Sequence, residues 1–410
     1  MTIAKSEPAL FEGLRVIEVG SFVAAPAAAT MLGDLGADII KIEQPGQGDL
    51  WRHQYKRPEL PTSDTNYLWY LTGRNKRSLA LDLKSKQGQD IFHLLIQNAD
   101  VFITNLPFKT RGSLSAEYET LEKINAKLIY ASFSGYGEHG QERHEISFDT
   151  TGWWARSGLM DQARPDPDGP PAKAPAAAGD HLSAVSLYGA IVSALYRREK
   201  TGQGAYVGSS LLANGVWQNA VYIQAALSGA SFKPIVKRED LWNPLNAVYR
   251  CHDDRWFSIT INPGHQLIYW QLFAKIMDCP DLLSDERFSS YDARLGHNRE
   301  LVKILDKAFI KGTAAHWKSK FQGTGIVSSI VAKCEDALTD DQMKANDILV
   351  PLQGVEGTQL TVNSPFFIRG QTKRAAHRAP DVGQHSVELL QEVGISDDQI
   401  KQLQAKNIVG

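Results

Sequence analysis

The sequence is poor in the features that would tie it to a disulfide, a metal or a membrane. It has only three cysteines in 410 residues, Cys251, Cys279 and Cys334. They are widely spaced and form no CxxC pair, so we expect neutral thiols, no metal site and a reducing, cytoplasmic location. No stretch approaches the roughly 18 apolar residues of a membrane span. Residues 1–12 also lack the apolar run of a signal peptide.

An excess of charge of either sign is also missing. Lysine and arginine total 44 against 46 acidic residues, which leaves a net charge of −2. This balance argues against a nucleic-acid or membrane partner, although a local basic patch can still bind a small anion. The 43% hydrophobic content is ordinary for a globular protein. The length exceeds what one core usually fills, so we expect two domains.

The first half of the chain alternates between strand-like and helix-like segments. Helices are predicted at 27–35 and 87–97, and strands at 14–19, 39–43, 77–82, 101–105 and 128–133. This alternation predicts an α/β fold with a parallel sheet, whose ligands bind beyond the carboxyl ends of the strands. The first strand is followed by Gly20-Ser21-Phe22-Val23, which is not the GxGxxG fingerprint of a dinucleotide-dependent oxidoreductase.

The second half begins with a Pro- and Ala-rich stretch, 164–178, that is incompatible with regular structure. It ends at Gly179-Asp180, ahead of a predicted helix at 182–196 with Gly202 as its C-terminal stop. Residues 230–330 predict a smaller α/β unit. From Lys333 the chain is predicted to return to the first domain, with a β-type segment at 360–368 and a helix at 386–392.

Seven sequence segments, spread along the chain, carry a family resemblance through their residues and their order. They are GLRVIEVGSFVAAPAAATMLGDLGADIIKIEQPGQGD (13–49), GRNKRSLALDL (73–83), ADVFITNLP (99–107), LIYASFSGYG (128–137), GDHLSAVSLYGAIVSALYRREKTGQG (179–204), NSPFFIRG (363–370) and APDVGQHSVELLQEVGIS (379–396). Together they resemble the class III CoA-transferases. This is the CaiB–BaiF family, which includes formyl-CoA and carnitine CoA-transferases and α-methylacyl-CoA racemase.

The resemblance implies a fold and an assembly that composition could not indicate. A Rossmann-like large domain is built from both chain ends, a smaller α/β domain lies between them, and two subunits interlock as a homodimer. On this basis we expect residues 1–225 to form the first part of a CoA-binding domain that carries the catalytic aspartate. Residues 226–330 are expected to form the small domain, and 331–410 to complete the large one.

The resemblance also places the nucleophile at Asp180. In such transferases the Gly-Asp after the variable loop takes CoA as a thioester, with CoA as a substrate and no permanently bound cofactor. A carboxylate near a helix start would be favoured in its ionised, nucleophilic form. The alternative is that Asp180 only caps the helix, since aspartate is a preferred N-cap residue.

Within the family, the main alternative is racemisation, which needs two acid–base groups. The racemase histidine position, aligned on Asp149, holds Phe148 here, and His144 lies four residues earlier. Phenylalanine cannot move a proton, so the sequence favours intermolecular transfer. An intramolecular isomerase of the mesaconyl-CoA type and a non-catalytic acyl-CoA-binding protein stay as further alternatives. The FVAAP and FITN turns look closest to members that act on short unsaturated dicarboxylates.

The resemblance further suggests CoA contacts in the turns after the strands and among nearby cations. The candidates are Val23, Ala24, Ala25, Gln44, Lys76, Arg77, Asn105, Leu106, Lys109, Arg111 and Tyr136. Val23 and Gln44 depart from the Gln and Arg of some members, which weakens any transfer of formyl or oxalyl specificity. Asn262-Pro263-Gly264-His265 stands where a glycine-rich lid loop is expected, and Trp153 and Trp154 are expected at or beneath the acyl pocket.

Overall fold

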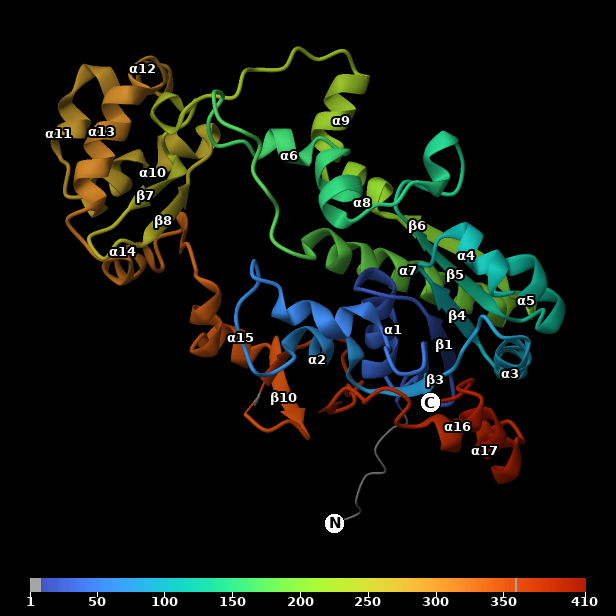
Figure 1. Ribbon diagram of the computed structural model, residues 1–410. Helices are drawn as coiled ribbons and strands as arrows, with labels where there is room; N and C mark the ends of the chain where they lie inside the picture. The colour runs from blue at the N-terminus through green and yellow to red at the C-terminus, as the bar shows by residue number, and fades with distance from the viewer. Residues whose placement is uncertain (1–8, 358–359) are drawn as a thin grey trace. The chain divides into compact units, whose positions relative to one another are not determined.

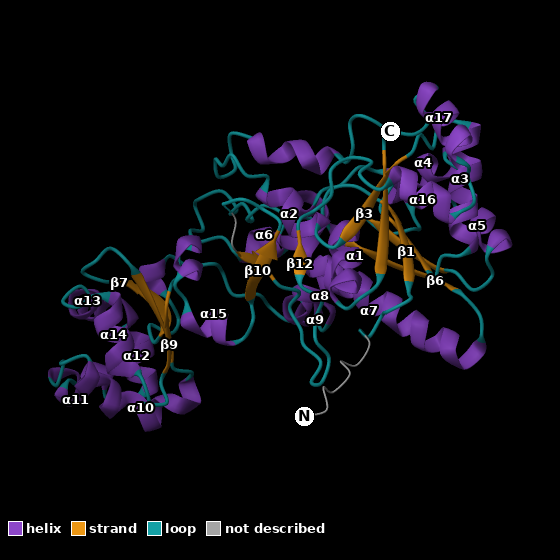
Figure 2. Cartoon of the chain, turned by 90° about the horizontal axis from the view of Figure 1, so that it is seen from below, coloured by secondary structure: helices purple, strands orange, loops and turns teal. Residues whose placement is uncertain are grey.

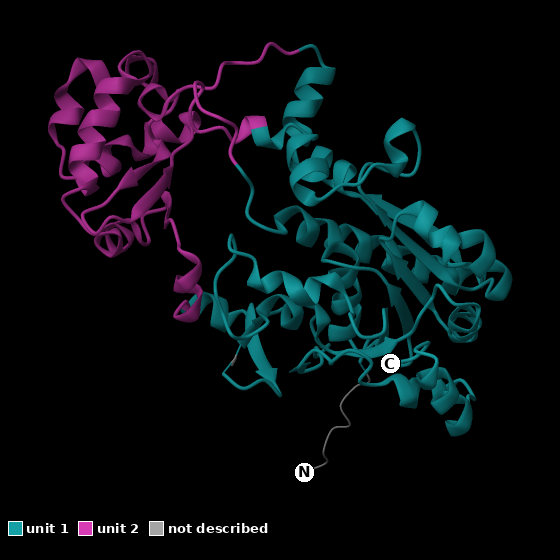
Figure 3. Ribbon diagram, in the orientation of Figure 1, with its two compact units in different colours: residues 1–160, 173–229, 341–410 teal, residues 161–172, 230–340 magenta. Residues whose placement is uncertain are grey.

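The computed structural model describes residues 9–357 and 360–410. Two compact units divide the chain. Unit 1 contains residues 1–160, 173–229 and 341–410, and unit 2 contains residues 161–172 and 230–340 (Figure 3). Compared with the division expected at 225 and 330, the second unit starts at 230, ends at 340 and also includes part of the Pro-rich stretch.

Unit 1 is built on a parallel six-stranded sheet in the order β3-β2-β1-β4-β5-β6 (Figure 1). This is the order of doubly wound sheets, in which ligands bind where the strand order reverses, here between β1 and β4. The strands are β1 (Arg15–Val19), β2 (Asp38–Glu43), β3 (Lys76–Ala80), β4 (Val101–Thr104), β5 (Ile129–Ser134) and β6 (Ala205–Ser210). The predicted parallel α/β sheet is therefore confirmed, although its last strand, β6, was not predicted.

One face of this sheet is covered by α1 (Ala24–Asp34) and α7 (Ala178–Thr201). Every residue of α1 is buried, and its small alanines allow close packing between the sheet and α7. The buried positions of α7 include Ala184, Leu187, Ile191 and Ala194, which recur at helical spacing and therefore form one apolar stripe. The helix ends at Thr201, and Gly202, the predicted stop, is its C-cap with a φ of +71° that suits glycine.

The opposite face packs against α3 (Lys86–Gln97) and two C-terminal helices, α16 (Ser386–Glu392) and α17 (Asp397–Ala405). Figure 2 shows all three along one side of the sheet. Leu389, Leu390 and Ile400 are buried with the strands, and the amide of Ser78 in β3 donates to His385 Nδ1 over 3.1 Å. Through these contacts the C-terminal segment packs against the same sheet as the N-terminal strands.

The remaining elements of unit 1 are α2 (Tyr67–Gly73), α4 (Phe108–Ser113), α5 (Tyr118–Ile124), α8 (Leu211–Gln218), α9 (Ala220–Leu227), α15 (Asp341–Ala345), and a small sheet of β10 (Leu349–Gln353), β11 (Leu360–Val362) and β12 (Ala376–His377). The β-type segment expected at 360–368 is therefore a strand only as far as Val362. A short helix, α6 (Leu159–Gln162), begins in unit 1 and ends in unit 2.

Unit 2 has its own apolar core and an antiparallel sheet in the order β7-β8-β9. Its elements are β7 (Asn246–Arg250), β8 (Trp256–Thr260), α10 (Pro263–Ile276), α11 (Asp281–Ser284), α12 (Tyr291–Gly296), α13 (Asn298–Phe309), α14 (Ala314–Phe321) and β9 (Val327–Ile330). The prediction of a lid loop at 262–265 is wrong, because this segment starts a helix. Asn262 is the N-cap of α10, and Pro263 begins its first turn. No helix in the described part of either unit is long and apolar enough to cross a membrane.

Candidate active site

Asp180 lies in the first turn of α7 as its third residue, and not at the capping position. The N-cap is Ala177, which has a left-handed φ of +58° and makes no side-chain capping bond. A non-glycine residue in this conformation is strained, and the surrounding structure must hold it there. The alternative that Asp180 only caps its helix is therefore wrong.

The helix is capped from another segment, by Asp149. The amide of Gly179 donates to Asp149 Oδ2 over 3.2 Å, and the amide of Thr150 donates to Oδ1 over 2.8 Å. The backbone amide of Asp180 also interacts with this carboxylate. Asp149 itself is buried at the start of a one-turn π-helix, Thr150–Ala155. Because Asp149 occupies the helix amides, the carboxylate of Asp180 is free for other chemistry.

The electrostatics of Asp180 differ from the sequence-based expectation. Burial raises the pKa of Asp180 to about 7, and the neighbouring Asp149 carboxylate adds to the rise. The helix start was expected to favour ionisation, but Asp149 already uses its amides. Among the residues that the structure describes, no side chain donates a hydrogen bond or an ion pair to the Asp180 carboxylate. Asp180 is thus a weakly acidic, uncompensated carboxyl group, as is common at catalytic sites.

The residue before Asp180 must be glycine for reasons of space. A Cβ atom on Gly179 would lie 2.5 Å from the Trp153 indole ring, well inside van der Waals contact. Trp153 is buried and Trp154 stacks on it, with ring centroids 5.3 Å apart. Trp153 therefore packs against the start of α7 and limits how closely the backbone next to Asp180 can approach the indole.

We expect Gly179→Ala to destabilise the protein by about 1–3 kcal/mol, because the methyl group must displace the indole or the helix start. Urea denaturation should show a lower midpoint, and kcat/KM should fall as Asp180 moves. The matched control is Gly189→Ala, in the same helix, where a Cβ meets nothing within 4 Å. There the higher helix propensity of alanine should leave stability unchanged or raise it by up to about 1 kcal/mol. Equal midpoints for the two variants would contradict this account of the Gly179–Trp153 contact.

The turn after β1 lies at the point where the strand order reverses, and Asn105 clamps it. Asn105 Oδ1 accepts from the Ser21 amide over 2.9 Å, and its Nδ2 donates to the Ser21 carbonyl over 2.7 Å. The next residue, Phe22, has a φ of +63°, and its amide donates to Asp49 Oδ1 over 3.2 Å. A bulky residue in this region is strained, so these bonds fix the shape of the turn.

Below this turn lies a fully enclosed ion cluster. Lys41 Nζ lies 2.6 Å from Glu18 Oε1 and 2.8 Å from Asp49 Oδ2, and Lys76 Nζ lies 2.6 Å from Glu18 Oε2. The two ammonium groups also donate to the carbonyls of Gly20 and Pro26, on either side of the turn. Each buried charge has a partner of opposite sign, as burial requires. The cluster anchors the turn from beneath.

Several of the predicted CoA contacts are occupied or enclosed. Val23, Ala24 and Ala25 are buried at the start of α1, so they form core and not an open turn. The enclosed ammonium of Lys76 cannot reach a phosphate. Arg77 is paired with Asp38, Glu388 and Glu392, whose negative charge disfavours a phosphate. Arg111 is buried and donates to Leu106, Ser132 and Phe133, so it holds the ends of β4 and β5 together. We withdraw these six residues as direct contacts.

The other predicted contacts are accessible to different extents. Gln44 and Lys109 are exposed, whereas Asn105, Leu106 and Tyr136 are half-buried. All five follow the carboxyl ends of β2, β4 or β5, which is where ligands of doubly wound sheets bind. The sequence reasoning missed Arg143, an exposed residue whose guanidinium lies 4.8 Å from the Phe108 ring centroid. The only indication of Arg143 in the sequence is that a basic residue follows the turn after β5.

The two positions considered for a racemase base, Phe148 and His144, both make aromatic contacts. Phe148 is half-exposed and packs against Phe22. His144 is exposed and packs its ring edge-on against Phe108, with centroids 6.2 Å apart. His181 follows Asp180, and burial together with Arg74 lowers its pKa, which favours a neutral ring. No group of residues in the described chain could hold a metal ion.

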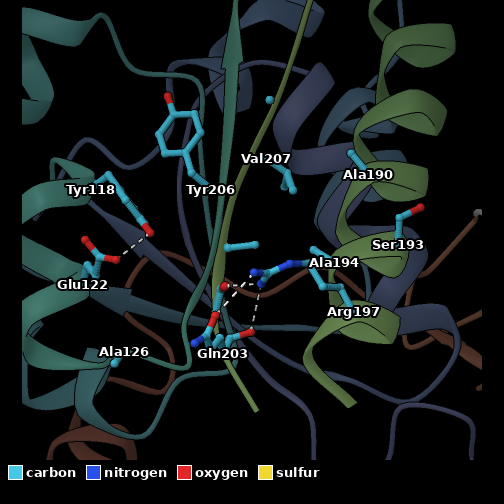
Figure 4. Close-up of a pocket in the computed structure, with 13 residues that line it drawn as sticks. Tyr118, Glu122, Ala126, Ala190, Ser193, Ala194, Arg197, Gln203, Tyr206 and Val207 are labelled. Atoms are coloured by element: carbon cyan, nitrogen blue, oxygen red, sulfur yellow. Dashed lines mark hydrogen bonds between the residues drawn. The ribbon is translucent and has the colours of Figure 1, made fainter. Parts of the chain in front are cut away.

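A cavity of about 910 Å³ lies elsewhere in unit 1, along β6 and between α5 and α7 (Figure 4). Its lining includes Tyr118, Tyr206 and Arg197. The lining residue on α7 that is nearest to Asp180 in sequence is Ala190, ten residues beyond it, about 15 Å at a rise of 1.5 Å per residue. The cavity is therefore not part of the Asp180 site.

Comparisons with known proteins agree with this geometry. Residues 11–386 match the profile of CoA-transferase family III. An (R)-2-hydroxy-4-methylpentanoate CoA-transferase from Clostridioides difficile is 32% identical over 98% of this chain and 99% of its own length. A succinyl-CoA:glutarate CoA-transferase from Mus musculus is 30% identical over 93% of this chain and 86% of its own length.

A solved structure supports the same assignment. A CaiB/BaiF family protein from Brucella suis superposes with a TM-score of 0.82 at 25% identity, over 94% of this chain and all of that one. The mixed α/β architecture with its parallel six-stranded sheet is thus shared with that family. Because the profile spans most of the sequence and relatives match nearly its whole length, the chain belongs to CoA-transferase family III and is an enzyme that transfers coenzyme A.

Proposed function

We propose that the protein moves CoA from an acyl-CoA donor to a carboxylic acid through an aspartyl-CoA thioester at Asp180. The observation that carries the proposal is the free, half-buried carboxylate of Asp180 at the start of α7. Asp149 holds the helix amides and leaves this group without a partner among the residues that the structure describes. A carboxylate that is partly desolvated and not ion-paired is more reactive as a nucleophile than one in water.

The reaction then proceeds by four acyl transfers that balance without any other reactant. The Asp180 carboxylate attacks the donor thioester, which forms a mixed anhydride and releases CoA thiolate. The thiolate attacks the Asp180 carbonyl, which forms the aspartyl-CoA thioester and frees the donor acid. The acceptor carboxylate attacks this thioester, giving a second anhydride and the thiolate again. The thiolate finally attacks the acceptor carbonyl, which releases the new acyl-CoA and regenerates Asp180.

Covalent trapping tests the proposal. Incubation with acetyl-CoA or succinyl-CoA, followed by hydroxylamine and peptide mass spectrometry, should give a hydroxamate at Asp180 only. Asp149, a buried carboxyl group beside it, serves as the internal control and should stay unmodified. Donor turnover with an unmodified Asp180 would exclude the thioester route.

Three alternatives differ from intermolecular transfer in what they require. Racemisation needs a second proton-transfer group, and Phe148 occupies the expected position; deuterium entry at the α-carbon without an acceptor acid would support it. Intramolecular isomerisation uses the same Asp180 and differs only in keeping both carboxyl groups on one substrate. A non-catalytic binding protein would exchange CoA with no acid.

For CoA itself, we propose a path over the carboxyl ends of β2, β4 and β5 in unit 1. The free cations along this edge are Lys109 and Arg143, which have no carboxylate partner among the described residues and suit the phosphates of CoA. Gln44, Leu106 and Tyr136 provide the surrounding surface, and Asn105 shapes the turn. We also propose a cytoplasmic location, with which the three unpaired cysteines agree.

We further propose the interlocked homodimer. It is supported by α9 (AVYIQAAL), an apolar helix in which none of the eight residues, all within the described chain, is buried. Val221 is 79% exposed, and Trp217 on the preceding helix is 81% exposed. A contiguous apolar surface of this kind marks a protein–protein contact.

We expect Val221→Glu to weaken the dimer, because the new carboxylate would be desolvated in the interface. Light scattering should then show monomer at concentrations where the parent protein is dimeric. Val387→Glu, an exposed valine on α16, is the matched control and should leave the mass unchanged. A parent protein that is monomeric at all concentrations would contradict the proposed assembly.

A further inference from the structure

Two phenylalanine rings form an aromatic surface beside the Asp180 corner of unit 1. Phe22 and Phe148 meet edge to face, with ring centroids 5.5 Å apart and an interplanar angle of 81°. Phe148 stays 51% exposed although it is a large apolar residue. It directly precedes Asp149, whose carboxylate binds the start of the helix that carries Asp180. The exposed ring therefore belongs to the same corner as the proposed nucleophile.

The backbone of both residues is fixed by hydrogen bonds, and each ring packs against another aromatic ring. The amide of Phe22 donates to Asp49, and its ring also packs against Trp51, with centroids 6.1 Å apart. The amide of Phe148 donates to Thr151 Oγ1 over 3.1 Å, and its carbonyl accepts from the amides of Thr151 and Gly152. A preorganised aromatic surface binds an apolar group at a smaller entropic cost than flexible side chains would.

The charges in this corner point to the same kind of ligand. Asp180 and Asp149 are both acidic, and burial raises the pKa of each. Arg74 is the cation whose charge acts on His181, the residue after Asp180, and its guanidinium is paired with Asp34 over 2.7 and 3.1 Å. Among the described residues, no cation forms an ion pair with Asp149 or Asp180, so the two carboxyl groups leave this corner acidic. A second substrate carboxylate would be desolvated beside two acidic groups, which is unfavourable.

We infer that the acids handled at this site are monocarboxylic acids with an apolar or aromatic body, and that Phe148 is a specificity-determining residue that contacts this body. The inference rests on the proposed function at Asp180 and names its substrate class. It departs from the short unsaturated dicarboxylates that the FVAAP and FITN turns suggested. Those turns are clamped or buried and present backbone and apolar side chains, so they supply no cation for a second carboxylate.

The test compares acceptors with a common donor, acetyl-CoA. For the parent protein, kcat/KM should be at least tenfold higher for 3-phenylpropanoate and 4-methylpentanoate than for glutarate and mesaconate. Phe148→Ala should lower kcat/KM for the two apolar acids by about tenfold, in the range that aromatic contacts provide, and leave the dicarboxylates unchanged. Phe148→Arg should raise kcat/KM for the dicarboxylates, because it adds the missing cation.

Tyr196→Ala is the matched control, since Tyr196 is an exposed aromatic residue on α7 about 24 Å from Asp180 at the helical rise. It should change neither class of acid. Two results would overturn the inference: a parent protein that prefers dicarboxylates, or a Phe148→Ala variant whose kcat/KM falls equally for both classes of acid. If the hydroxamate still forms at Asp180, the proposed function stands in either case. Failure with every acid, together with no hydroxamate, would overturn the proposed function and this inference with it.

Discussion

Replacing Asp180 with asparagine should lower kcat for CoA transfer by at least about 1000-fold, as the loss of a covalent nucleophile does in other enzymes. An amide cannot displace a thiolate and cannot carry the thioester. Asparagine has nearly the same volume as aspartate, and no described side chain hydrogen-bonds to the Asp180 carboxylate. The fold should therefore be retained. The measurement is transfer from acetyl-CoA to an acceptor acid under saturating conditions.

Two further variants make this result decisive. Asp180→Ala excludes slow deamidation of asparagine back to aspartate as a source of residual rate. Asp149→Asn keeps the nucleophile and one capping oxygen, so it should retain far more activity than either Asp180 variant. If both Asp180 variants keep more than about a tenth of the parent rate, Asp180 is not the nucleophile.

The sequence predicted much of the fold because the relevant signals are local. Short apolar runs such as 101–105 and 128–133 become β4 and β5 with boundaries shifted by about a residue. The helix predicted at 386–392 coincides with α16, although it is not the terminal helix, because the unpredicted α17 follows it. By contrast, β6 was missed because its six residues, AYVGSS, contain little apolar character and follow closely after a long helix. Only pairing with β5 makes this segment a strand.

The candidate site was less predictable, because its properties depend on residues far apart in the sequence. Lys76 looked like a phosphate ligand, but register places it on the same face as Glu18, 58 residues away, where it is enclosed. Asp180 looked like a cap, but Asp149, 31 residues earlier, takes that role. A sequence shows the residue types and their spacing. It does not show which carboxylate accepts the hydrogen bonds of the helix amides.

The Asp149–Asp180 pair also predicts how activity depends on pH. Asp180 must be ionised to attack. Burial, and to a smaller extent the charge of Asp149, raises its pKa to about 7. A raised pKa keeps the group protonated and inactive at lower pH, so kcat/KM should fall as pH drops through 7. Below that point the loss should be about tenfold per pH unit, which gives roughly a hundredth of the plateau rate at pH 5. The carboxylic substrates titrate well below this range.

Asp149→Asn isolates the contribution of the pair. Asparagine can still accept a hydrogen bond from the Gly179 or Thr150 amide through its Oδ1 atom, but it carries no charge. With the like charge removed, the pKa of Asp180 should fall, and the acid limb of the kcat/KM profile should move to lower pH. Because the substrates are identical for both proteins, their own titrations cancel in this comparison. A limb that keeps its position would show that burial alone sets the ionisation of Asp180. A limb that moves to higher pH would contradict the electrostatic coupling of the two carboxylates.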